Sequence, residues 1–298
     1  MATQTKKPPP VRACLFDMDG LLLDTEDIYT DVTNTLLRRH GRPPLPWSIK
    51  AQLQGRPGPE ASRIFHAWAQ LPIPQDEYMA EQSKLQHELF PNAKPLPGVV
   101  ELLETLKTRT GGAVRLALAT SSHSGNYGLK TARWSELFDV FPAECRVLGD
   151  DPRLGKGRGK PAPDIYLLAL EMVNARLRRE GVREEELIRP EECLVFEDSV
   201  PGVEAGRRAG MQVVWCPHPG LREEYQGREE EVLAGMTGEH KEADDQGARL
   251  AQANEMLVQK ETGEKRRDGK PGQVGDGWGV YLETLENFPY ERFGIKIA

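Results

Sequence analysis

The sequence has few cysteines, no long apolar run and no excess of basic residues. Its four cysteines, Cys14, Cys145, Cys193 and Cys216, form no C-x-x-C pair, which favours free thiols in a reducing compartment over a disulfide framework. No apolar stretch approaches the roughly 18–20 residues that cross a bilayer. Lys and Arg number 39 against 46 Asp and Glu, a net charge of −7, which argues against a general nucleic-acid binder. These absences predict a cytoplasmic protein with no membrane and no nucleic-acid partner.

The remaining composition is that of a globular chain. The 298 residues provide room for about two domains of roughly 100–200 residues each. Apolar residues make up 38% of the chain, and 29 glycines bring the total close to the roughly 45–50% typical of globular proteins. Residues 1–10 carry two lysines and three prolines but no apolar stretch, so we expect a flexible tail rather than a secretory signal.

Short apolar runs alternate with helical periods along most of the chain. Strands are predicted at 11–16, 115–119, 146–148, 193–196 and 212–216. Helices are predicted around 28–40, 59–71, 76–90, 99–110, 129–137, 161–179 and 200–209. Strands that alternate with helices indicate a parallel sheet with both faces covered. We therefore expect an α/β fold, a doubly wound, Rossmann-like core with a small α-helical cap domain.

Two blocks interrupt this alternation. Residues 27–94 contain only helical periods, so they are expected to form a separate cap inserted into a core made of 11–26 and 95–221. Residues 222–277 are rich in charged residues, Gly and Gln and poor in aromatic and β-branched residues. Such a segment buries too little apolar surface to offset its ordering entropy, so we expect it to be disordered.

Two shorter predictions concern the C-terminal third of the chain. Within the charged segment, residues 249–260 could form a solvated helix. Residues 278–298 regain aromatic and branched residues and are expected to return to the core.

Polar side chains follow three of the predicted strands at the point where each strand ends. Asp17 and Asp19 follow the first strand, Thr120 and Ser121 follow the strand at 115–119, and Glu197 and Asp198 follow the strand at 193–196. Ligands of open parallel sheets bind outside the carboxyl ends of the strands. If these strands are neighbours, four carboxylates and two hydroxyls converge on one crevice, and Lys160, just before a helix start, can reach the same place.

Such a cluster indicates phosphoryl-transfer chemistry. Several carboxylates close together repel one another unless a cation holds them. Oxygen ligands select a hard cation such as Mg²⁺, which typically binds one or two carboxylates plus substrate phosphate. Lys160 and the hydroxyls would stabilise the charge of the phosphoryl group, one carboxylate could attack phosphorus, and another could carry a proton.

Four sequence motifs strongly resemble those of haloacid-dehalogenase-superfamily phosphatases. They are Phe16-Asp-Met-Asp-Gly-Leu-Leu-Leu-Asp-Thr-Glu26, Leu118-Ala-Thr-Ser-Ser122, Gly159-Lys-Pro-Ala-Pro-Asp164 and Val195-Phe-Glu-Asp-Ser-Val-Pro-Gly-Val-Glu-Ala-Gly206. They stand in the family's order and span most of residues 11–220. Within the superfamily, Leu148-Gly-Asp-Asp-Pro152, Gly210-Met-Gln-Val-Val214 and the stretch from Phe288 to Gly294 most resemble eukaryotic pseudouridine-5′-phosphatase-like proteins, which generally lack the charged segment.

The resemblance implies a role for each matching residue. Asp17 would be the nucleophile, and Asp19 the general acid and base that also gives its backbone carbonyl to the metal. Asp198 would be a magnesium ligand and Glu197 a ligand directly or through water. The remaining three, Thr120, Ser121 and Lys160, would hold the phosphoryl group, with Lys160 bridging it to Asp17.

The position of the helical block matches the type-one cap of the family, which closes over small substrates. The segment Gln54-Gly-Arg56 resembles the cap loop that reaches the substrate, which makes Arg56 a candidate substrate contact. Trp47, Phe65 and Trp68 could stack on a base, although helical spacing favours a place in the cap core for Phe65 and Trp68.

The function expected is Mg²⁺-dependent hydrolysis of a small phosphorylated metabolite, a nucleoside, sugar or polyol phosphate, with pseudouridine 5′-phosphate as the first candidate. A phosphomutase on the same scaffold is the nearest alternative. A regulatory or binding protein that recruits a partner through residues 222–277 is an alternative of another class. The sequence retains all the motif residues, which argues against the regulatory or binding protein.

Overall fold

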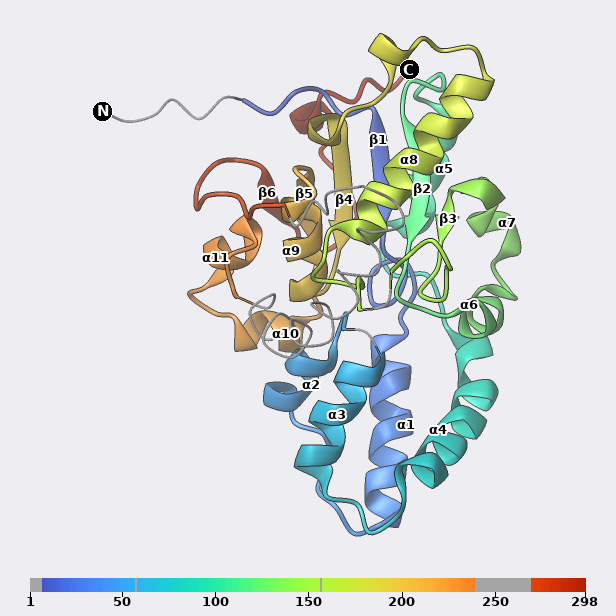
Figure 1. The fold of residues 1–298 in the computed structure, drawn as a ribbon, viewed down its shortest axis with the longest axis vertical. Helices are drawn as coiled ribbons and strands as arrows, with labels where there is room; N and C mark the ends of the chain where they lie inside the picture. The colour runs from blue at the N-terminus through green and yellow to red at the C-terminus, as the bar shows by residue number, and fades with distance from the viewer. Residues whose placement is uncertain (1–6, 57, 156, 239–268) are drawn as a thin grey trace, which may run out of the picture.

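A six-stranded parallel sheet forms the centre of the molecule (Figure 1). The computed structural model describes residues 7–56, 58–155, 157–238 and 269–298. The strands are β1 (Ala13–Phe16), β2 (Arg115–Ala119), β3 (Arg146–Val147), β4 (Cys193–Glu197), β5 (Gln212–Trp215) and β6 (Gly279–Tyr281). Each neighbouring pair runs parallel in the order β3-β2-β1-β4-β5-β6. This is the strand order of a doubly wound sheet, so the predicted fold class is confirmed.

Helices follow most of the strands and also build the block between β1 and β2. They are α1 (Glu26–Arg39), α2 (Trp47–Leu53), α3 (Gly58–Ala69), α4 (Gln75–Leu89), α5 (Val99–Thr108), α6 (Ser124–Thr131), α7 (Ser135–Phe138), α8 (Asp164–Arg179), α9 (Val200–Arg208), α10 (Pro219–Glu224) and α11 (Glu229–Ala234). Short 3-10 turns lie at Phe90–Asn92, Ala143–Cys145, Glu184–Glu186, Pro190–Glu192 and Tyr290–Phe293. The single helical segment predicted at 129–137 is two short helices, α6 and α7.

Both faces of the sheet are covered by helices, as the apolar residues of the inner strand β1 require. Ala13 and Leu15 of β1 belong to the cluster that α8 and α9 complete. Cys14 and Phe16 point to the opposite face, into the cluster that α5 and the C-terminal residues complete. Alternation along a strand sends successive side chains to opposite faces, so a run without polar residues requires helices on both sides.

Helices α1 to α4 form a cap beyond the carboxyl ends of the strands (Figure 1). Their shared core contains Leu36 and Leu37 of α1, Phe65 of α3 and Tyr78 of α4. The rings of Phe65 and Tyr78 lie 5.0 Å apart between centroids. The cap therefore has a small apolar core of its own between its helices.

The charged segment predicted at 222–277 differs in part from the prediction. It contains α11, in which Val232 is fully buried against α9 and β6. The side chain of Arg207 in α9 also forms an ion pair with Asp276 near the end of the segment. A short Val-Leu-Ala run after the glutamates buries enough apolar surface to fix this helix, and the segment's overall composition concealed it.

Parts of the predictions fall outside the described residues. These are the expected tail over residues 1–6 and the central part of the charged segment, 239–268, which includes the helix predicted at 249–260. Among the residues that the structure describes, no helix is long and apolar enough to cross a membrane.

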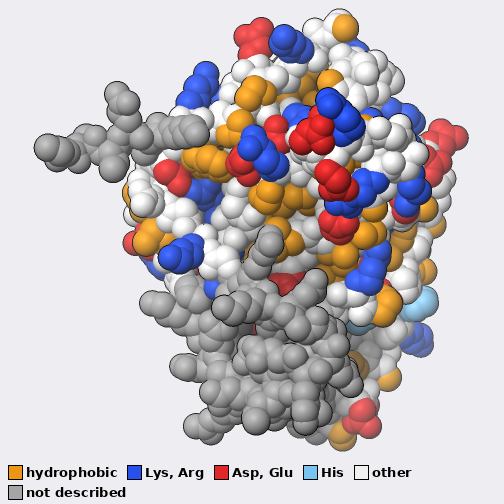
Figure 2. Space-filling model, turned by 45° about the horizontal axis from the view of Figure 1, so that its top comes forward, with side chains coloured by type: hydrophobic (Ala, Val, Ile, Leu, Met, Phe, Trp, Pro, Cys, Tyr) orange, Lys and Arg blue, Asp and Glu red, His pale blue; other side chains and the backbone are white. Residues whose placement is uncertain are grey.

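Basic and acidic side chains are mixed over the face of the molecule drawn in Figure 2. On the part of the surface that the structure describes, basic and acidic residues form ion pairs, such as Arg178 with Glu184 at 2.6 Å and Arg183 with Glu186 at 2.7 Å. A basic residue that is paired with a carboxylate is already neutralised and adds little attraction for a polyanion.

Candidate active site

The carboxyl ends of three adjacent strands bring the predicted polar residues together. Asp17 follows β1, Thr120 follows β2, and Glu197 ends β4. Phe16 of the central strand lies level with Leu118 on one side and Phe196 on the other, so the residues that follow are also level. The chain order reverses between β1 and β4, and this switch point is where open parallel sheets bind ligands.

Asp17 and Glu197 share one buried lysine. The ammonium Nζ of Lys160 lies 2.5 Å from Asp17 Oδ1 and 2.5 Å from Glu197 Oε1. The hydroxyl of Tyr166 in α8 also donates to Glu197 Oε1, at 2.5 Å. The other oxygen, Oε2, accepts from Ser199 Oγ at 3.0 Å and from two backbone amides. Both oxygens of Glu197 are thus committed to protein donors, which fixes Lys160 beside Asp17.

Asp198 completes a group of three acidic residues that could hold a metal ion. One carboxylate oxygen from each of Asp17, Glu197 and Asp198 lies within 4.8 Å of the others. Asp198 Oδ2 accepts a hydrogen bond of 2.5 Å from Gln54 Nε2 of the cap, and its backbone oxygen accepts from Trp215 Nε1 at 2.8 Å. This all-oxygen donor set, with one lysine against three carboxyl groups, fits a hard divalent cation such as Mg²⁺.

Burial and repulsion between carboxylates disfavour the charged forms of Asp17 and Asp198. Burial, opposed by Lys160 and reinforced by Glu197 and Asp19, raises the pKa of Asp17 from 3.8 to about 7. Burial, together with Glu197 and Asp17, raises the pKa of Asp198 well above its usual value. A bound cation would reverse this tendency, because positive charge favours ionised carboxylates.

Asp19 is held separately from Asp17, by a second buried lysine. Lys130 Nζ lies 2.5 Å from Asp19 Oδ1, which also accepts from Thr25 Oγ1 at 2.7 Å. Ser122 Oγ donates to the other oxygen, Oδ2, at 2.7 Å. Burial alone would raise the pKa of Asp19, but Lys130 and the hydroxyl donors outweigh it and lower the pKa below 3.8. Two aspartates two residues apart therefore have pKa values shifted in opposite directions.

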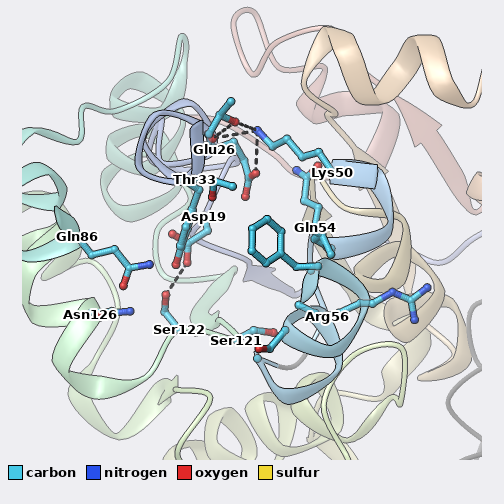
Figure 3. A pocket seen from close by; sticks show the side chains of 18 of the residues that line it. Asp19, Glu26, Thr33, Lys50, Gln54, Arg56, Gln86, Ser121, Ser122 and Asn126 are labelled. Carbon is cyan, nitrogen blue, oxygen red and sulfur yellow. Dashed lines mark hydrogen bonds and ion pairs between the residues drawn. The ribbon is translucent and has the colours of Figure 1, made fainter. Parts of the chain in front are cut away.

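A cavity of about 350 Å³ lies between this site and the cap. Its floor includes Asp17, Asp19 and Asp198. In Figure 3, Gln86 and Asn126 lie on one side of the cavity, and Gln54 and Lys50 on the other. The volume falls in the range of pockets that hold small metabolites, roughly 300–1,000 Å³.

Of the residues predicted to hold phosphate, Ser121 lines the cavity, and Thr120 and Lys160 lie beside the aspartates of its floor. Thr120 is fully buried, and its hydroxyl accepts from the Ser122 amide at 3.1 Å. Ser121 lines the cavity, and the backbone at Gly149 packs so closely on it that a Cβ there would lie 2.1 Å from Ser121 O. Lys160 lies beside Asp17, as described above. The structure thus brings together the three predicted phosphate ligands.

Arg56, the predicted cap contact, lines the cavity, but its guanidinium is directed elsewhere. Its Nη1 lies 2.7 Å from Glu60 Oε1, one helical turn further along. In Figure 3 the side chain points away from Ser121 and Asp19. Contact between this guanidinium and a substrate would require it to leave Glu60.

Two lysines of the site carry no signal in the sequence. Lys130 lies inside a helix, and Lys50 of α2 forms an ion pair of 3.2 Å with Glu26 at the cavity wall. Lone lysines on helices are ordinary surface residues in a sequence, and only the tertiary contact distinguishes these two. Gln54 lies in the cap loop that the sequence indicates, but its hydrogen bond to Asp198, 144 residues away, is seen only in the structure.

The three aromatic residues considered for base stacking lie in different places in the structure. Phe65 packs in the cap core and also lines the cavity. Trp68 packs against that core, as its spacing predicts. Trp47 stacks instead on His218 of the core at 4.6 Å between ring centroids and is not among the residues that line the cavity.

The chain is similar to a known family and to known proteins. The family model of haloacid dehalogenase-like hydrolases matches residues 11–210, about two thirds of the chain. The chain belongs to this family and is a hydrolase.

Particular relatives cover nearly the same region. A probable pseudouridine-5′-phosphatase of Saccharomyces cerevisiae is 43% identical over 228 residues, 76% of this chain and 91% of that protein. (DL)-glycerol-3-phosphatase 2 of Arabidopsis thaliana is 35% identical over 224 residues, 74% of this chain and 86% of that protein. The crystal structure of a hydrolase of the same family from Deinococcus radiodurans, with bound phosphate and sodium, is 28% identical. It superposes with a TM-score of 0.51 over 71% of this chain and 82% of that one.

Proposed function

We propose that this protein is a Mg²⁺-dependent phosphatase that removes phosphate from a small phosphomonoester through an aspartyl-phosphate on Asp17. The chain is a phosphoric monoester hydrolase of the haloacid dehalogenase-like family. The single observation that carries the mechanism is the pair of aspartates on two separate lysines, Asp17 on Lys160 and Asp19 on Lys130. One carboxylate can then attack phosphorus while its neighbour moves the proton.

The first step transfers the phosphoryl group to Asp17. Asp19, which is ionised in the free protein, first takes a proton from the monoanionic form of the substrate phosphate. A carboxylate oxygen of Asp17 attacks phosphorus, the bond to the ester oxygen breaks, and Asp19 gives that oxygen the proton. Lys160 stabilises the charge on the phosphoryl oxygens, with Thr120 and the backbone of Ser121 as further donors. In the second step Asp19 takes a proton from water, which attacks the same phosphorus and releases Asp17.

Mg²⁺ would be held by Asp17, Asp198 and the backbone carbonyl of Asp19. Glu197 would act through water, because both of its oxygens accept from protein donors. When bound, the ion supplies positive charge that offsets the phosphoryl group and the clustered carboxylates.

The cavity favours an uncharged, hydroxyl-bearing leaving group. Its walls offer the amides of Gln82, Gln86 and Asn126, and Phe65 provides an apolar surface for a ring. These groups suit a nucleoside, sugar or polyol. We take pseudouridine 5′-phosphate as the first candidate, since the yeast and fly relatives are named as probable phosphatases of that compound. Glycerol phosphate is the second.

The test is release of inorganic phosphate from a panel of phosphomonoesters, with Mg²⁺ and with EDTA. The panel contains pseudouridine 5′-phosphate, glycerol 3-phosphate, hexose phosphates and flavin mononucleotide. Metal-dependent release with one strong preference is the expected result. Folded protein that releases no phosphate from any compound would overturn the proposal, and isomer exchange on sugar phosphates would then test the mutase alternative.

A further inference from the structure

Lys130 is a buried cation that lies behind the proposed proton donor rather than in the cavity. Its side chain is fully buried, whereas the side chain of Asp19 stays 16% exposed and lines the cavity. The three residues that accept from its ammonium, Asp19, Ser122 and Tyr29, all line the cavity, so Lys130 lies behind them. A residue in that place acts on the substrate only through Asp19.

All three N–H groups of the Lys130 ammonium have acceptors on different parts of the chain. They are Asp19 Oδ1 at 2.5 Å, Ser122 Oγ at 2.8 Å and Tyr29 OH at 2.8 Å. These come from the loop after β1, the loop after β2 and helix α1. An ammonium has three donors and no acceptor, so no donor remains for a substrate.

Two aromatic rings also lie beside the ammonium. Its Nζ lies 4.5 Å from the centroid of the Phe90 ring and 4.7 Å from that of Tyr29. Such cation–π contacts keep a buried ammonium charged and restrict its movement. Burial lowers the pKa of Lys130, but Asp19 and Tyr29 outweigh this and raise it above its ordinary value.

The second lysine of the site cannot replace Lys130. Lys160 is bonded to Asp17 and Glu197, on the other side of the site. Without Lys130, Asp19 would keep only the neutral hydroxyls of Thr25, Ser122 and, at 3.5 Å, Thr120 as side-chain donors. Ser122 would itself lose the ammonium that now donates to its oxygen. The carboxyl group would then have no fixed charge to hold its orientation.

We propose that Lys130 is a positioning residue, which fixes the carboxyl group of Asp19 in line with the leaving-group oxygen. The proposal rests on the function proposed above. As the Asp17–phosphorus bond forms and the phosphorus–oxygen bond breaks, the bonding electron pair stays on the departing oxygen, which takes the proton of Asp19. A small displacement of the donor is costly at this step, because proton transfer requires contact at hydrogen-bond distance.

The test compares two leaving groups in wild type and in Lys130→Met, which keeps the chain length and removes the charge. The alkoxide of pseudouridine 5′-phosphate or glycerol 3-phosphate needs a proton to leave, whereas the phenolate of p-nitrophenyl phosphate does not. The ratio kcat/KM reports the step in which the leaving group departs. It should fall about 10²–10³-fold for the alkyl phosphate, and by less than about fivefold for the aryl phosphate.

Two further variants keep the test decisive. Lys50→Met removes another buried lysine, one that contacts Glu26 and not Asp19. It should change both substrates to a similar extent. Tyr29→Phe keeps the ring and removes one acceptor of Lys130, and should give a smaller loss, about three- to tenfold, for the alkyl phosphate alone. This variant decides the matter if Lys130→Met does not fold.

The outcomes separate this inference from the proposed function. If wild-type protein hydrolyses neither class of ester, the proposed function fails. If wild-type protein is active and the Lys130 and Tyr29 variants lose both activities equally, or lose neither, the positioning role is refuted. A selective loss in Lys50→Met as well would show that the effect does not pass through Asp19.

Discussion

Removing the charge of Asp17 should stabilise the metal-free protein at neutral and basic pH. Asp17 is buried with Glu197 and Asp198, and Lys160 is the cation paired with it. Its pKa is raised from 3.8 to about 7 in the folded, metal-free protein. Between these values the folded state keeps a proton that the unfolded chain has lost. The free energy of unfolding therefore falls as the pH rises through this window.

The size of the effect follows from the pKa difference. Between about pH 5 and the folded pKa of about 7, the free energy of unfolding falls by about 1.4 kcal/mol for each pH unit, because only the folded state still holds the proton. The fall ends at about pH 8, where the folded state has lost the proton as well. Wild-type protein in EDTA should thus lose up to about 3 kcal/mol of stability relative to Asp17→Asn over this range. For a chain of this size the difference corresponds to a change in Tm on the order of 10 °C.

Thermal unfolding of wild-type protein and Asp17→Asn, each in EDTA and in Mg²⁺, measures this directly. In EDTA the Tm of the variant should exceed that of wild type at about pH 8, and the gap should narrow at about pH 5. Mg²⁺ should close the gap at the higher pH, since about 100 times its Kd stabilises the folded state by about 2.7 kcal/mol. Parallel pH profiles of the two proteins in EDTA would refute the reasoning about the carboxylate cluster.

Three further perturbations test other parts of the site. Gly202→Ala should cost about 1–3 kcal/mol and most of the activity, because its Cβ would lie 1.8 Å from Glu197 Oε1. The control Gly128→Ala, in a helix with open space around the Cβ, should raise the stability by about 0.5–1 kcal/mol, and a comparable loss of Tm in both would contradict the packing argument. Replacing residues 239–268 with a short linker should leave kcat within a few-fold, since the described site residues lie elsewhere; a folded but inactive product would show otherwise. Arg56→Met should leave KM within about twofold, because the guanidinium is paired with Glu60 and points away from Asp19, and a tenfold rise in KM would show that it turns to the substrate.

The sheet and the acidic floor of the site could be predicted from the sequence because local rules suffice for both. Continuous apolar runs such as those ending at Phe16 and Phe196 predict buried parallel strands. Carboxyl ends of neighbouring parallel strands meet at one edge, so the polar residues that follow each run are brought together. Asp17 and Glu197 therefore meet although 180 residues separate them.

The residues that support the aspartates from neighbouring helices, such as Lys130, could not be predicted, because their position depends on which helices pack together. Lys130 in α6 and Lys107 in α5 are both lysines near the end of a short helix, yet one is fully buried and the other exposed. Helix α2 was missed because its seven residues cover only about two turns, too few to show a period. Helix α11 was missed because a charged run precedes its apolar residues.

The central claim is that Asp17 carries the phosphoryl group during turnover. Acid quenching within the first turnovers, followed by mass spectrometry, should find the mass of one phosphoryl group on the peptide that contains Asp17. Asp17→Asn, which keeps the volume and loses the nucleophile, should show no such adduct and should release phosphate more slowly by several orders of magnitude. A phosphoryl group on another residue, or near-normal phosphate release by Asp17→Asn, would contradict the account.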